Sequence, residues 1–186
     1  MKKEDLKQDM TQNAIAVGTI VHEISSIQEA VQYAVDLTEK QHLKTMACPG
    51  LDNEAGDMLS ELCKSHDLKL LDSPLRENAH NLDVSLTLTE YGIAETGSLM
   101  VASDSEEMRI ATMLAQIHVA VLPVSKIRPN AKAIESNLDT ILKTDTPSYT
   151  AFITGPSRTA DIERVLAIGV HGPVELHLLL MEETKP

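Results

Sequence analysis

Strand-like and helix-like segments alternate along most of this chain, and that alternation constrains its fold more than any other feature. Short apolar runs predict strands, whereas apolar residues at helical spacing predict helices. The predicted strands cover residues 44–47, 68–72, 83–102, 118–124, 148–155 and 174–182, and the predicted helices cover residues 26–41, 52–66, 105–116, 130–143 and 159–169. Such alternation favours an α/β fold with a mostly parallel sheet flanked by helices.

The length of 186 residues fits one domain with a sizeable core. The first strong helix signal is the capping-box pattern from Ser26 to Glu29. Residues 1–25 show only weak periodicity, and we interpret them as an N-terminal arm or surface helix. Residues 26–186 are predicted to form a single α/β domain.

The charge balance bears on possible partners. The chain has 28 acidic and 16 basic residues, which gives a formal net charge of −12. This charge repels nucleic-acid phosphates and anionic lipid headgroups, and no basic run with interleaved aromatic residues is present. Neither a nucleic acid nor a membrane surface is therefore an expected partner, whereas homo-oligomer formation stays open.

Cysteine content limits the cofactors that the chain could hold. Cys48 and Cys63 are the two cysteines, without the further pair that a zinc or iron–sulfur site usually needs. We expect no cofactor in this chain. The first residues are charged, and no apolar run reaches the roughly 20 residues that span a bilayer. We therefore expect a cytoplasmic protein.

The stretch ITGPSRTADIERVLAIGVHGP, residues 153–173, is the first candidate site. An apolar run, AFITG, predicts a central strand, and a helix is expected to begin near residues 157–159. A helix amino end after a strand can bind an anion. The candidate ligand-binding residues are Gly155, Ser157, Arg158, Thr159, Asp161 and His171. The alternative is a well-capped helix, followed by a tight turn at His171, with no ligand at all.

The second candidate site is GIAETGSLMV, residues 92–101. Gly92 and Gly97 interrupt an apolar run, which predicts two strands on either side of a bend. Glu95 is the candidate catalytic carboxylate, and the residues beside it, Thr96, Gly97 and Ser98, are candidate ligand-binding residues. The alternative is a bulged turn with a solvated glutamate.

Both stretches, together with HVAVLPVSKI, resemble the LUD-domain family. The order and spacing of GPSRTADIE and GVHGP carry most of the resemblance, which covers about residues 82–180. Family members often have threonine where this chain has Ser98, a change that keeps the hydroxyl group. The resemblance implies the fold of the sugar-phosphate isomerase and CoA-transferase (NagB/RpiA-like) superfamily. It also implies a role beside two iron–sulfur partner proteins in oxidising L-lactate to pyruvate.

Three hypotheses follow from these observations. The chain is a cluster-free subunit of a lactate-oxidising system, or a stand-alone transferase or isomerase that binds a phosphate-like or CoA-like anion, or an assembly module. No Gly-x-Gly-x-x-Gly pattern follows a predicted strand, which argues against a self-contained dinucleotide-dependent dehydrogenase. We further expect residues 94–98 and 155–159 to meet at the carboxyl ends of neighbouring strands.

Overall fold

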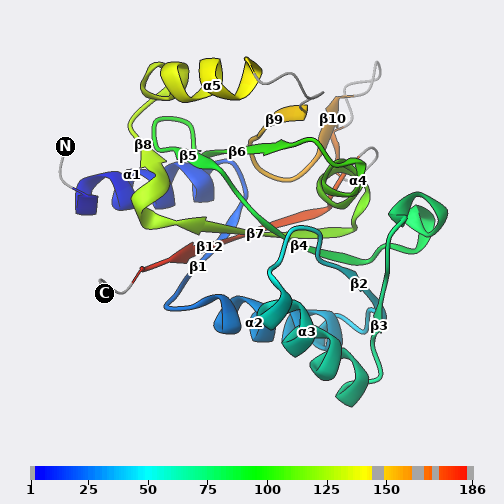
Figure 1. Ribbon diagram of the computed structural model, residues 1–186. Helices are drawn as coiled ribbons and strands as arrows, with labels where there is room; N and C mark the ends of the chain where they lie inside the picture. Colours follow the sequence, from blue (N-terminus) through cyan, green and yellow to red (C-terminus); the bar gives the residue numbers. More distant parts are fainter. Residues whose placement is uncertain (1–2, 144–148, 161–165, 169–171, 184–186) are drawn as a thin grey trace.

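A six-stranded parallel sheet forms the centre of the protein in a computed structural model that describes residues 3–143, 149–160, 166–168 and 172–183 (Figure 1). Every neighbouring pair of strands in this large sheet runs parallel. In spatial order the strands are β1 (Ile20–Ile24), β12 (Glu175–Met181), β7 (Ile117–Pro123), β4 (Val84–Leu88), β2 (Thr45–Ala47) and β3 (Lys69–Leu70). The predicted α/β class with a mostly parallel sheet is confirmed.

Two helices cover one face of the large sheet, α2 (Ile27–Lys40) and α3 (Asn53–Ser65), and Figure 1 shows them side by side. Ser26 caps α2 as predicted, because its hydroxyl accepts the Glu29 N–H at 3.2 Å. Asp52 caps α3 in the same way through the Ala55 N–H at 2.9 Å. Fully buried residues of α2, including Val31 and Val35, pack against the central strands in one apolar cluster.

A second, four-stranded sheet and α1 (Lys3–Ala16) lie over the opposite face. Its strands, in spatial order, are β8 (Ile127–Arg128), β5 (Tyr91–Ile93), β6 (Ser98–Ser103) and β9 (Tyr149–Ile153). Helix α5 (Glu135–Leu142) packs on this sheet through Leu138. Strand β7 serves both layers, because Val119 and Val121 face α2 and α3 whereas Ala120 and Leu122 face the second sheet.

Helix α4 (Glu106–Leu114) links β6 to β7 and packs beside the large sheet. Short 3₁₀ turns lie at Leu75–Glu77, Ala79–Asn81, Val124–Lys126 and Ala131–Ile134. Ser105 caps α4, because its hydroxyl accepts the Glu107 N–H at 3.2 Å. Helix α4 begins near the carboxyl ends of β2 and β3, because Ser105 lines a cavity with residues that follow those strands, and it leads the chain to the amino end of β7.

The segment expected as an N-terminal arm or surface helix, residues 1–25, contains α1 and also β1. Strand β1 pairs with β12 and forms one edge of the large sheet. Helix α1 buries Met10 and Ala14 completely against the second sheet. The sequence of this segment does not predict β1, because its apolar residues show only weak periodicity.

The helix predicted over residues 159–169 is wrong. Strands β10 (Arg158–Ala160) and β11 (Leu166–Ile168) stand there instead and pair antiparallel. The prediction of a central strand at AFITG is also wrong, because β9 is an edge strand of the second sheet and Phe152 is half exposed. Residues 83–102 contribute to three strands, β4, β5 and β6, rather than the two that were predicted.

Candidate functional site

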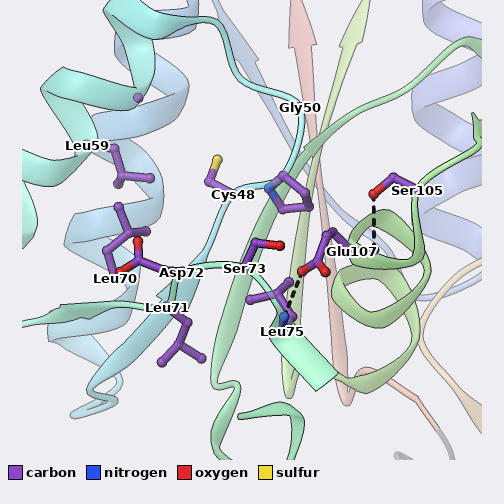
Figure 2. A pocket seen from close by; sticks show the side chains of 12 residues that line it. Cys48, Gly50, Leu59, Leu70, Leu71, Asp72, Ser73, Leu75, Ser105 and Glu107 are labelled. Carbon is purple, nitrogen blue, oxygen red and sulfur yellow. Dashed lines mark hydrogen bonds between the residues drawn. The ribbon is translucent and has the colours of Figure 1, made fainter. Parts of the chain in front are cut away.

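A cavity of about 340 Å³ opens at the carboxyl ends of β2 and β3, between α3 and α4 (Figure 2). Strands β3 and β4 lie on opposite sides of β2. Ligands of open α/β sheets bind in crevices outside the carboxyl ends of the strands, and this cavity opens there. The cavity is lined by Cys48, Pro49, Gly50, Gly56, Leu59, Leu70, Leu71, Asp72, Ser73, Leu75, Ser105 and Glu107.

The polar lining of this cavity consists of acceptors and hydroxyl groups. Figure 2 shows Ser105 and Glu107 on the α4 side and Leu59 on the α3 side. The Glu107 carboxylate accepts the Leu75 N–H at 2.8 Å, which fixes its position. Asp72 and Glu107 are carboxylates, and the described residues that line the cavity include no lysine, arginine or histidine. The cavity therefore favours ligands that donate hydrogen bonds over ligands that carry negative charge.

Cys48 contributes a thiol to the cavity wall. Its Sγ atom donates to the Leu86 carbonyl oxygen at 3.2 Å. Burial raises the pKa of the Cys48 thiol far above its ordinary value, with a smaller effect of Cys63. The uncharged thiol is a weak nucleophile, so Cys48 provides soft apolar surface rather than a reactive thiolate.

Glu95 and the candidate ligand-binding residues beside it form a turn at one end of the second sheet, away from this cavity. Hydroxyl groups connect there in a chain, because Ser98 Oγ lies 2.7 Å from both Thr96 Oγ1 and Thr154 Oγ1. The Glu95 side chain is exposed and lines none of the four cavities described for this protein. Its backbone N–H donates to the Pro129 carbonyl oxygen at 3.0 Å.

Gly97 in this turn lies directly against α1. Its φ is +62°, and a Cβ atom there would be 2.3 Å from the Ala14 backbone nitrogen. Asn13 Nδ2 also donates to the Ala94 carbonyl oxygen at 2.8 Å. The close approach of α1 explains the glycine without any ligand.

Three of the predicted ligand-binding residues, Gly155, Ser157 and Arg158, line a surface groove of about 400 Å³. Phe152 and Met113 are apolar neighbours in the same groove. Arg158 is exposed, and its Nη2 atom donates to the Val17 carbonyl oxygen at 2.6 Å, just beyond the end of α1. This bond uses one of the five N–H donors that a guanidinium carries.

The remaining predicted residues are placed less fully. Thr159, a predicted ligand-binding residue, lies in β10 and not at the start of a helix. Asp161 and His171 lie outside the described residues. In the part of the chain that the structure describes, no three His, Cys, Asp or Glu side chains are grouped so that they could hold a metal ion. None of the described helices is long and apolar enough to cross a membrane.

The two predicted stretches meet through Ser98 and Thr154 at one end of the second sheet. Because β6 and β9 are antiparallel, the amino end of β6 lies beside the carboxyl end of β9, and the large sheet is not involved. Sequence reasoning missed the cavity beside Cys48 altogether. Two features of the sequence could have indicated this cavity, the Pro49-Gly50 turn after β2 and the Asp72-Ser73 pair after β3.

A comparison with known protein families shows the family of this chain. The LUD domain model matches residues 7–181, which is nearly the whole chain. The chain belongs to the LUD-domain family. The match begins within the segment predicted as an N-terminal arm and extends beyond residues 82–180, where the sequence resemblance was found.

Curated relatives of this LUD-domain protein include three named lactate utilization protein C. The one from Halalkalibacterium halodurans is 32% identical over 111 residues, 59% of this chain and 48% of the relative. The one from Oceanobacillus iheyensis is 30% identical over 141 residues, 72% of this chain and 58% of the relative. The one from Bacillus subtilis is 32% identical over 111 residues, 58% of this chain and 45% of the relative. The chain thus spans about half the length of the curated relatives it matches.

A solved structure shares the fold of this LUD-domain protein. It is the crystal structure of a DUF162 family protein from Deinococcus radiodurans, with a TM-score of 0.64 and 14% sequence identity. The similarity covers 97% of this chain and 99% of the other. At that identity the likeness supports the architecture alone.

Proposed function

We propose that this LUD-domain protein is a component of an L-lactate utilization system and acts there with iron–sulfur partner proteins. The observation that carries the proposal is the family match over residues 7–181, together with relatives of about 30% identity that are named lactate utilization protein C. Within such a system, we assign this protein to the oxidation of L-lactate to pyruvate.

That oxidation removes two electrons and two protons from the substrate, so an electron acceptor must be close at hand. Two cysteines in this chain are fewer than the four thiolates that commonly hold an iron–sulfur cluster. The proposal therefore assigns electron transfer to clusters in the partner proteins. This chain then binds the acid or positions its partners.

The groove beside Arg158 is the place that we assign to the carboxylate of the acid. Arg158 brings a guanidinium to a wall that also holds Ser157 and Thr154, and charge-assisted bonds from arginine suit carboxylates. The cavity beside Asp72 and Glu107 is less suitable, because its charged side chains would repel a carboxylate. Glu95 has no cavity of its own among those described, so the transferase or isomerase alternative gains no support from this geometry.

The experiment is L-lactate-dependent dye reduction in extracts of the organism that encodes the chain, with its gene deleted. We expect the extract to have lost this activity and to recover it when the purified chain is added. The purified chain alone should reduce no dye with lactate. Full activity in the deletion extract, or lactate-dependent reduction by the chain alone, would contradict the proposal.

A further inference from the structure

We infer that the cavity between α3 and α4 binds a ribonucleoside, with the hydroxyl groups of the ribose at Asp72 and Glu107 and the base against the apolar wall. This inference is independent of the proposed lactate role, because it concerns a different cavity and a ligand of different charge.

The position of the cavity in the fold is the first argument. Strand β2, helix α3 and strand β3 form a βαβ unit, and the cavity opens at the carboxyl ends of both strands. In doubly wound folds an acidic residue after the second strand of such a unit accepts hydrogen bonds from ribose hydroxyls. Asp72 stands just after β3 and lines the cavity, so it occupies the equivalent place.

The charge of the lining is the second argument. The carboxylates of Asp72 and Glu107 can accept hydrogen bonds from a ligand, and Asp52 and Glu54, outside the lining, add negative charge at the start of α3. A phosphate or carboxylate would be repelled there, whereas sugar hydroxyls can donate to the carboxylates. The Leu75 N–H uses one of the roughly four acceptor positions on the Glu107 carboxylate, which leaves capacity for a ligand.

The apolar wall and the volume are the third argument. Leu59, Leu70 and Leu75 present aliphatic surface to the same cavity, beside the uncharged Cys48 thiol. A planar base can pack against such a wall while the sugar faces the carboxylates. The volume of about 340 Å³ falls within the range of small-molecule sites, about 300–1,000 Å³.

Gly56 provides a clean way to block the cavity. It lies on α3 and lines the cavity, and a Cβ atom at this position would meet no atom within 4 Å. A side chain introduced at Gly56 therefore starts in open space beside the cavity, and leucine is large enough to fill part of it. Gly56→Leu should fold normally, which thermal unfolding of the variant will verify.

The test is isothermal titration of the full chain with adenosine, guanosine, cytidine and uridine, and with D-ribose. We expect at least one ribonucleoside to bind, its 2′,3′-dideoxy counterpart to bind at least about tenfold more weakly, and D-ribose to bind more weakly still. Gly56→Leu should abolish binding, and Asp72→Ala should weaken it by about tenfold. Asp57→Ala is the matched control, because Asp57 is an exposed α3 carboxylate outside the lining and its loss should leave the affinity unchanged.

Three results would overturn the inference. The first is that none of the four ribonucleosides binds at concentrations up to about 10 mM. The second is that a ribonucleoside binds equally well to folded Gly56→Leu, which would place it elsewhere on the protein. The third is that D-ribose or the dideoxy compound binds as tightly as the ribonucleoside.

Discussion

His118 shows how a single residue sets a condition on the stability of the fold. It is completely buried on β7, and its Nε2 atom lies 2.8 Å from Thr87 Oγ1. Among the described residues, its Nδ1 atom has no hydrogen-bond partner. Burial lowers the pKa of His118 from 6.5 to about 4, because the imidazolium ion would lose its hydration.

This pKa predicts a loss of stability in mild acid. The unfolded chain takes up a proton at His118 near pH 6.5, whereas the folded protein takes it up only near pH 4. The stabilisation that comes from keeping His118 uncharged is complete above about pH 6.5. About 3 kcal/mol of unfolding free energy is lost as the pH falls from 6.5 to 4. Urea unfolding at about pH 7 and about pH 4.5 measures the loss.

His118→Asn is the comparison for this prediction, because asparagine takes up no proton in that range. The variant should show a smaller fall in unfolding free energy between the two pH values. An equal fall in both proteins would assign the acid sensitivity to other groups, such as His177, whose pKa burial also lowers.

Arg158 is the second residue with a measurable consequence. Arg158→Ala removes the bond to the Val17 carbonyl oxygen beyond the end of α1, so we expect a loss of about 0.5–1.5 kcal/mol in unfolding free energy. If the groove holds the carboxylate of the acid, affinity for L-lactate should fall by about tenfold as well. Urea unfolding and titration calorimetry test the two effects separately, and Arg158→Lys, which keeps the charge, should lose less of each.

At the scale of the elements, the contact of α1 with the turn at Gly97 predicts contrasting effects of alanine at two glycines. Gly97→Ala places a Cβ atom against the α1 backbone at a positive φ, so we expect about 3 kcal/mol of destabilisation. Gly56→Ala meets open space inside α3 and should stabilise the protein by about 0.5–1 kcal/mol. Similar urea midpoints for the two variants would contradict this account of the packing.

The helices and strands also show how far secondary structure could be predicted from local sequence patterns. Helices α2, α3, α4 and α5 were predictable, because each carries an apolar face at helical spacing and three of them have a polar capping residue. Residues 159–169 carry the same spacing, yet β10 and β11 form there. A helix of that length is marginal on its own, so tertiary pairing decides the conformation, and the sequence pattern does not contain that pairing.

At the scale of the whole molecule, the candidate sites were only partly predictable. Hydroxyl groups and Arg158 could be recognised from the local sequence, but their positions depend on β9 lying at the edge of a second sheet. The cavity beside Asp72 and Glu107 joins the βαβ unit of β2, α3 and β3 to the start of α4, which lies further along the chain. Such a juxtaposition follows from the strand order, which no single segment encodes.

Growth on L-lactate tests the central claim most directly. The encoding organism with this gene deleted should grow poorly with L-lactate as the carbon source and normally with pyruvate, because pyruvate is the product of the proposed oxidation. The wild-type gene supplied in trans should restore growth on L-lactate. Normal growth of the deletion strain on L-lactate would contradict the proposed role in lactate utilization.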